Sequence, residues 1–493
     1  MIKHWKFGIR VLVFVTILVL LISEINYILM PKKYFDDNWP TTSTYKGFYQ
    51  MKADSIDVLF LGSSHAAAAF NPQVIYDNYG IGSYNLGCEE QNLLVSYYWL
   101  KEALKYQSPK VVVLDTFMVF NHKGYEALNT PEACTRMAMD AMKWSEVKWN
   151  AIKDICDNDE NQLFNSYLFK NIRFHTRWTY LQENDFSFRE LEKHYELKGY
   201  APLSMRGTDV DTDYLPYEQV DTETYMEMMP LMKEYLDKIV DLCKTDNITL
   251  VLTKCPTTLW NISKHNTVNE YAREKEIYFW DFNEKELYDA SGFVFGQDMN
   301  DNGHSNIWGA EKLSLYVGDT FSRSFEVKGC DCSEQWSETA GYYQQVFSDC
   351  KLQYIVDLPE YIDAINQPRY TVLIGSKYDI TYCMNEEAKS AFAKLGLDLS
   401  TEQFEGYYAA ISGYGIIEGK GRGKLLYSGS VRNNMVDFTI SSEQTGVMTG
   451  NSCSIKINNI EYAKDLNGVN IVVYSNETRK VVDSVVYDGQ LHR

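Results

Sequence analysis

The sequence has few basic residues, and this shortage excludes one large class of function. It contains 47 Lys and Arg against 67 Asp and Glu, which gives a formal net charge of -20. It also lacks a basic stripe interleaved with aromatic residues, so we expect no nucleic-acid partner. Internal repeats and low-complexity tracts are missing as well. With 45% hydrophobic and 23% charged residues, the chain has the composition of folded globular protein rather than of a disordered one.

Metal-ligand spacing is also absent, although the chain has ten cysteines. Cys330 and Cys332 are too close together for a usual zinc knuckle, and we expect neither a metal nor another cofactor. If the bulk of the chain is exported, Cys330, Cys332 and Cys350 are candidates for a disulfide. Free buried thiols are the alternative.

The N-terminus contains the long apolar run of the sequence. Three basic residues within the first ten positions precede Val11–Ile22, and apolar character resumes at Tyr27–Met30. Residues 1–31 are therefore predicted to be a short cytoplasmic start and an uncleaved transmembrane signal anchor, with everything after about residue 31 outside the cell membrane. A cleaved signal peptide is the alternative, but no small-x-small cleavage motif follows the run.

At 493 residues the chain exceeds what one hydrophobic core usually supports, and its first folded part alternates strands with helices. Buried strands are predicted at residues 56–61, 83–86, 110–115, 248–253 and 277–281. Helices are predicted at 93–106, 222–243, from the fourth strand to about 275, and from about 308. This α/β pattern predicts a flavodoxin-like three-layer αβα domain with a parallel sheet over residues 38–327 and a helical insertion at about 121–220. Ligands are expected beyond the carboxyl ends of the strands.

The remainder of the chain changes in character. Residues 328–349 are polar and aperiodic and are predicted to be a linker. Residues 350–489 are predicted to form a smaller α+β domain, with strands at 370–374, 421–427 and 468–474 and a helix at 385–395.

Three residues of the α/β domain have the types that nucleophilic catalysis needs. Ser64 follows the first strand in a turn that Gly62 permits, while Asp301 and His304 lie three residues apart before the last helix. A serine becomes a good nucleophile when an imidazole takes its proton and a carboxylate orients that imidazole. Taken singly, a serine such as Ser64 is more often a helix cap than a nucleophile, and Asp301 with His304 is more often a surface turn.

Two neighbouring residues have less defined roles. His65 is expected to be a pocket-wall or capping residue rather than a second base. Lys254 follows the fourth strand, where it either lines the cleft or is solvated.

The order of these motifs resembles the SGNH/GDSL hydrolase superfamily, whose first block is Gly-Asp-Ser and whose last block is Asp-x-x-His. The resemblance implies that Ser64 is the nucleophile, His304 the base and Asp301 the residue that orients it. Asn85-Leu-Gly87 looks like the second block, which implies that the Gly87 and Ser64 N–H groups form an oxyanion hole. Two departures stand out: Ser63 replaces the Asp of the first block, and no Gly-x-Asn of the third block follows the third strand. The nearest similarity is to the membrane-anchored group that includes the teichoic acid D-alanyl transfer protein and alginate-acetylation-like proteins.

The C-terminal part resembles an ILEI/PANDER-like domain. The resemblance rests on Gly468-Val-Asn-Ile-Val-Val473, on the hairpin that follows it, and on Tyr487-Asp488. It implies a carbohydrate-recognition module, and a purely structural role is the alternative.

Together these features predict an extracytoplasmic serine acyl-ester hydrolase or O-acyltransferase that acts on a cell-surface glycan or a teichoic-type polymer. The membrane anchor adds a membrane acyltransferase as an expected partner. The alternative is a catalytically weak SGNH scaffold that binds glycan or organises an envelope polysaccharide assembly.

Overall fold

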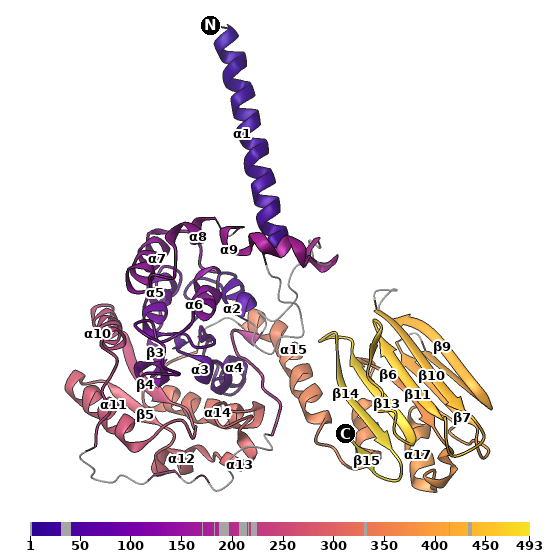
Figure 1. The fold of residues 1–493 in the computed structure, drawn as a ribbon. Helices are drawn as coiled ribbons and strands as arrows, with labels where there is room; N and C mark the ends of the chain where they lie inside the picture. Colours follow the sequence, from indigo (N-terminus) through magenta and orange to yellow (C-terminus); the bar gives the residue numbers. More distant parts are fainter. Residues whose placement is uncertain are drawn as a thin grey trace. The chain divides into compact units, whose positions relative to one another are not determined.

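The computed structural model divides the chain into two compact units, Met1–Ala340 and Gly341–Arg493. The structure describes residues 2–30, 41–169, 171–181, 183–186, 197–206, 214, 216–217, 224–329, 333–413, 415–431 and 436–493. Figure 1 shows the helices and strands of both units. Cys330 and Cys332 lie outside the described residues, and Cys350 is half-buried.

The first unit begins with the long helix α1 (Ile2–Leu29). Its segment Lys6–Leu29 contains an 18-residue window with a mean hydropathy of 2.4, and no residue of that window is buried against the rest of the protein. The helix is long and apolar enough to cross a membrane, although a signal sequence has the same properties.

A five-stranded parallel sheet forms the centre of the first unit, as the sequence predicts. Its order is β2-β1-β3-β4-β5, with Val58 of β1 paired to Val111 of β3. The strands are β1 (Val58–Leu61), β2 (Ser83–Asn85), β3 (Val111–Asp115), β4 (Thr249–Lys254) and β5 (Tyr278–Asp281).

Alternate residues of these strands serve two separate hydrophobic cores, because successive side chains of a strand point to opposite faces. Leu59 and Val112 belong to one core, and Val58 and Val111 to the other. Helices α5, α10 and α11 contribute to the first core, and α3, α4 and α14 to the second, which makes a three-layer αβα unit. These helices are α3 (Ser64–Ala69), α4 (Pro72–Tyr79), α5 (Leu93–Ala103), α10 (Pro230–Thr245), α11 (Ile262–Lys275) and α14 (Ile307–Arg323).

The predicted insertion is largely helical in its described residues up to Phe186, whereas residues 201–206 and Tyr217 are not helical. Its helical elements are α6 (Glu132–Met139), α7 (Glu146–Asn158), α8 (Phe164–Leu168), α9 (Asn171–Phe174), η2 (His175–Thr179) and η3 (Glu183–Phe186), and η1 (Phe117–Val119) precedes it. The unit also contains α2 (Thr41–Phe48), α12 (Lys285–Ser291) and α13 (Phe295–Asp298).

Two predicted elements differ from the structure. The helix expected from residue 222 begins at Pro230, because a proline fits the first turn of a helix and the described residues before it are not helical. The segment expected to be an aperiodic linker contains a 20-residue helix, α15 (Ser333–Leu352). Trp336 gives this helix a buried anchor, since its ring stacks on Tyr76 at 4.5 Å between centroids.

The second unit is rich in β-structure and has three layers. Its six-stranded sheet has the order β15-β14-β13-β6-β7-β8, and its four-stranded sheet the order β12-β11-β10-β9. One core lies between the six-stranded sheet and helices α16 and α17, and another between the two sheets. The helical elements are α16 (Leu358–Ile365), η5 (Ile380–Tyr382) and α17 (Glu386–Lys394). The strands are β6 (Tyr370–Lys377), β7 (Gly406–Ser412), β8 (Gly415–Gly421), β9 (Gly423–Val431), β10 (Val436–Gln444), β11 (Ser452–Ile457), β12 (Ile460–Glu461), β13 (Gly468–Ser475), β14 (Lys480–Tyr487) and β15 (Leu491–His492).

Candidate active site

The candidate site lies at the carboxyl edge of the parallel sheet, where β1, β3 and β4 end side by side. The chain leaves β1 through Gly62, whose φ of +132° is a conformation that L side chains rarely adopt. A Cβ at this position would lie 2.7 Å from the Cβ of Asp115 at the end of β3. Glycine therefore allows the turn after β1 to approach the neighbouring strand closely.

The two serines that follow have different structural roles. Ser63 is the N-cap of α3, and its hydroxyl accepts a hydrogen bond from the His65 N–H. Ser64 therefore does not serve as the cap. Its Oγ lies 2.8 Å from Nε2 of His304, which is 240 residues away in the sequence.

Asp301 and His304 meet within one turn before α14. Nδ1 of His304 lies 2.9 Å and 3.0 Å from the two carboxylate oxygens of Asp301. The N–H groups of Gly303 and His304 also donate to this carboxylate. Burial alone would raise the pKa of Asp301, but the hydrogen bonds and the charge of His304, together with the Gly303 N–H, lower it to about 2. The carboxylate is thus ionised at neutral pH and able to orient the imidazole.

The loop that carries these two residues is tied to the loop after β4. The Thr257 hydroxyl donates to the backbone oxygen of Asn302 at 2.8 Å, and the Thr258 N–H donates to the same oxygen at 3.1 Å. On its other side, the Asn306 amide donates to the backbone oxygens of Gln297 and Met299. These bonds hold the loop on rigid elements.

Asp281, a buried carboxylate at the end of β5, helps to fix the loop that carries His304. Asp281 accepts hydrogen bonds from Trp260, His265 and Asn283. Burial tends to raise the pKa of Asp281, yet these partners, led by His265, lower it below its usual value. Asn283 in turn accepts the N–H of Thr257, so the network extends to the residue that anchors the His304 loop.

The two predicted oxyanion donors, the N–H groups of Ser64 and Gly87, differ in the structure: the first is available for a ligand and the second is already hydrogen-bonded. Ser64 N–H donates to no hydrogen-bond acceptor among the described residues. Gly87 N–H, by contrast, donates to the Asn85 side chain at 3.0 Å, and Gly87 does not line the cavity beside Ser64. The Asn85 amide is itself held by the backbone oxygens of Ala66 and Phe70. In this conformation Asn85-Leu-Gly87 thus stabilises the local backbone, and the Gly87 N–H is not available to an oxyanion.

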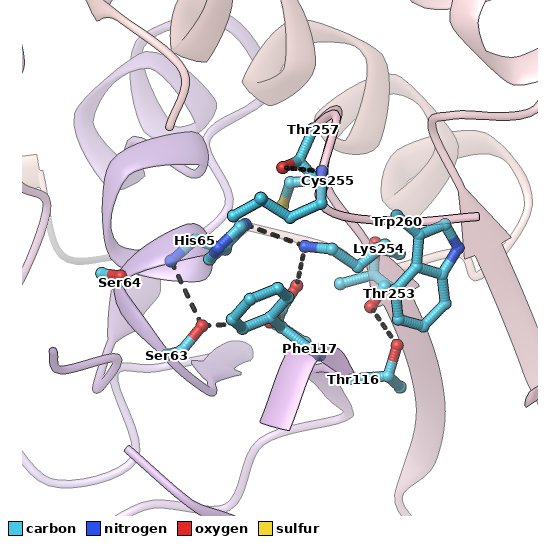
Figure 2. A network of polar contacts seen from close by, with 12 residues as sticks. Ser63, Ser64, His65, Thr116, Phe117, Thr253, Lys254, Cys255, Thr257 and Trp260 are labelled. Carbon is cyan, nitrogen blue, oxygen red and sulfur yellow. Dashed lines mark hydrogen bonds and ion pairs between the residues drawn. The ribbon is translucent and has the colours of Figure 1, made fainter. Parts of the chain in front are cut away.

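A buried charged network borders Ser64, and sequence reasoning did not assign it. Nζ of Lys254 lies 3.1 Å from Oδ2 of Asp115 and 2.9 Å from Nδ1 of His65 (Figure 2). Oδ1 of Asp115 accepts the Ser63 hydroxyl at 3.2 Å and the Phe117 N–H at 3.1 Å. Lys254 is fully buried, which excludes the solvated one of its two alternatives. The available signal was that two neighbouring apolar strands, β3 and β4, each end in a charged residue.

Ser64, His304 and Asp301 open onto a cavity of about 430 Å³. Apolar side chains such as Phe117 and Leu259 line part of it, and Glu89, Glu90 and Lys123 add charge. Glu90 pairs with Lys123 at 2.5 Å and lies 3.7 Å from Nε2 of His122. The cavity is large enough for a small ligand that has an apolar part and a polar part.

The fold and the site define a parallel three-layer α/β unit with a hydrogen-bonded Ser-His-Asp chain at the carboxyl edge of its sheet. Such a chain can withdraw a proton from the serine hydroxyl and return it to a leaving group. No group of three or more His, Cys, Asp or Glu side chains in the described part of the chain is arranged to hold a metal ion.

Comparisons with known proteins give only distant similarities. No protein-family model and no curated protein matches the chain. A solved structure from Desulfitobacterium hafniense, assigned as a lipolytic protein of the G-D-S-L family, is 13% identical with a TM-score of 0.26, over 53% of this chain and 97% of that one. A structure from Bacteroides fragilis, assigned as an acylhydrolase, is 13% identical with a TM-score of 0.26, over 60% of this chain and 99% of that one.

Proposed function

We propose that the protein is a serine-dependent acyl-ester hydrolase or O-acyltransferase that uses Ser64, His304 and Asp301. The observation that carries this proposal is the 2.8 Å contact between Ser64 Oγ and Nε2 of His304, whose Nδ1 faces the Asp301 carboxylate. The 2.6–3.2 Å range for a nucleophile and its base includes this distance.

In the proposed reaction, Ser64 Oγ attacks the carbonyl carbon of an ester while His304 Nε2 takes the hydroxyl proton. The carbonyl π pair moves to its oxygen, and the Ser64 N–H donates to the resulting oxyanion. Collapse of the tetrahedral intermediate expels the alcohol, which takes the proton from His304. Water or a sugar hydroxyl then attacks the acyl-serine by the same steps. Asp301 keeps the imidazole in the Nδ1–H tautomer throughout.

A cell-surface glycan or a teichoic-type polymer is the substrate class we propose. The cavity of about 430 Å³ accommodates a small acyl group and about one sugar unit. Helix α1 would anchor the enzyme in the cell membrane, and the basic residues before Val11 favour a cytoplasmic N-terminus with the bulk of the chain outside. That position would suit transfer of an acyl group supplied by a membrane acyltransferase.

A fluorophosphonate probe on the full chain tests the proposal. Wild-type protein should be labelled covalently and should hydrolyse p-nitrophenyl acetate, whereas Ser64→Ala should do neither. Ser263→Ala, a serine at the start of α11, is the matched control and should behave as wild type. Labelling that persists in Ser64→Ala would contradict the assignment of the nucleophile.

The alternative is a catalytically weak scaffold that binds glycan, with the C-terminal unit as the recognition module. The engaged Gly87 N–H favours it, because an oxyanion hole with few donors stabilises the transition state poorly. Wild-type protein that shows neither labelling nor turnover, but binds a purified polysaccharide, would support this function over the enzymatic one.

A further inference from the structure

The buried network beside Ser64 determines which nitrogen of His65 carries a proton. A protonated lysine has only donors, and Lys254 is charged opposite the buried carboxylate of Asp115. Nδ1 of His65, which lies 2.9 Å from Nζ, must therefore accept. In a neutral imidazole one nitrogen accepts and the other donates, so the ring proton is on Nε2.

The position of the His65 ring directs this Nε2–H to the cavity. The ring stacks on Phe117 at 4.1 Å between centroids, and the ring of His304 lies 5.1 Å away on a tilted plane. His65 lines the same cavity as Ser64. Its Nε2 makes no hydrogen bond to any described residue, and it is not among the buried atoms that lack a partner, so it opens onto the cavity.

The Nε2–H of His65 is a candidate oxyanion donor at a site where two of the expected donors are not available. The Gly87 N–H is engaged by Asn85, and β3 continues into Asp115-Thr116 in place of a Gly-x-Asn block. The Ser64 N–H belongs to a residue that lines the cavity, and it donates to no acceptor among the described residues. An oxyanion that forms there would gain much from a second, fixed N–H.

We propose that His65 is a catalytic residue whose Nε2–H donates a hydrogen bond to the oxyanion, and that Lys254 and Asp115 are positioning residues that fix its tautomer. This inference rests on the function proposed above. His65 transfers no proton: His304 takes the Ser64 proton, the carbonyl π pair moves to oxygen, and Ser64 N–H and His65 Nε2–H hold that oxygen until the C=O bond forms again. The Lys254 ammonium adds positive charge behind the ring and makes Nε2–H a better donor.

The electrostatic surroundings keep His65 neutral. Burial and then the positive charge of Lys254 lower the pKa of His65 well below its usual value, with smaller contributions from His304, His122 and Lys264. A ring that already carries its proton on Nε2 and is not readily protonated on Nδ1 donates to a ligand and does not act as a base. This separates the role of His65 from that of His304.

Two substitutions at residue 65 test the proposal in the full chain. His65→Phe keeps a planar ring without a donor, and we expect kcat for p-nitrophenyl acetate and the rate of fluorophosphonate labelling to fall about 10²- to 10³-fold while KM changes little. His65→Gln offers an amide N–H in place of the ring N–H, and its kcat and labelling rate should be at least tenfold higher than those of His65→Phe. If His65→Phe is as fast as wild type, the inference fails although the proposed function stands. If wild type itself is neither labelled nor active, the proposed function fails.

A measurement on the wild-type chain covers the case in which the variants do not fold. Labelling with ¹⁵N-histidine reports the tautomer directly, and the proposal requires Nε2–H with an unprotonated Nδ1 that does not titrate near neutral pH. Addition of the fluorophosphonate places a P–O oxygen in the oxyanion position, so the Nε2–H proton should move downfield. An Nδ1–H tautomer, or an Nε2–H signal that the adduct does not move, would overturn the proposal.

Discussion

The backbone of Gly62 lies so close to Asp115 that a methyl group on the glycine would have to displace the carboxylate side chain, with 2.7 Å between the two Cβ atoms. The same glycine has a φ of +132°. Gly62→Ala therefore combines backbone strain with steric overlap, and we expect a loss of roughly 2–4 kcal/mol in the free energy of unfolding.

Gly292→Ala is the control for that prediction. Gly292 also has a positive φ, +67°, but a Cβ there meets nothing within 4 Å. Its loss should be roughly 1 kcal/mol, from strain alone. Chemical denaturation of both variants gives the comparison, and equal losses would show that the approach to Asp115 has no energetic effect.

The two adjacent serines should respond differently to alanine. Ser63→Ala removes the N-cap of α3 and a contact to Asp115, which we expect to lower stability by about 1–2 kcal/mol while fluorophosphonate labelling persists. Ser64→Ala should abolish labelling with little change in stability, because its hydroxyl caps no helix. Thermal melting and labelling measured on both variants check the pair. Loss of labelling in Ser63→Ala alone would mean that the motif is out of register by one residue.

The pKa of about 2 for Asp301 predicts a pH dependence of stability. The folded-state pKa is lower than the usual value of 3.8, so the carboxylate stabilises the folded protein above about pH 4 and loses that contribution as the pH falls towards 2. Asp301→Asn should lack this component, and its stability should fall less than that of wild type between pH 4 and 2. Urea unfolding at several pH values measures the difference. Parallel curves for the two proteins would contradict the predicted shift.

The sequence predicts those elements of the fold that have a clear hydrophobic pattern or a clear signal at their ends, such as a helix cap. The apolar run at 110–115 is β3, and Asn306 caps α14 directly after the Asp301-x-x-His304 turn. The helix α15, most of which lies within residues 328–349, was not predicted, because that segment is polar and aperiodic in sequence although Trp336 within it is buried. Single side chains outside a periodic stripe carry little weight in a pattern, although Trp336 is fully buried in the structure.

The site was predictable only in part, for a related reason. Ser64 and His304 belong to motifs whose order along the chain indicates their contact. The pairing of Asp115 with Lys254 depends on β3 and β4 being neighbours in register, a fact of topology that local sequence does not contain. The engagement of Gly87 by Asn85 likewise depends on a side-chain rotamer.

Removal of Lys254 separates the structural role of its network from the chemical one. Lys254→Met leaves the fully buried carboxylate of Asp115 without its cation, which should lower stability by roughly 3–5 kcal/mol. The double variant Lys254→Met/Asp115→Asn has no unpaired charge and keeps an acceptor for Ser63 and Phe117, so much of this stability should return.

Activity should not return with stability in the double variant. Without the ammonium, Nδ1 of His65 has no fixed donor, so the Nε2–H tautomer is no longer enforced and kcat should stay well below that of wild type. Denaturant unfolding and p-nitrophenyl acetate kinetics on the same samples check both halves. A double variant that regains both stability and full kcat would mean that the buried pair only supports the fold. The reason is that methionine at position 254 has no N–H to donate to Nδ1 of His65 and so cannot fix the tautomer of the ring.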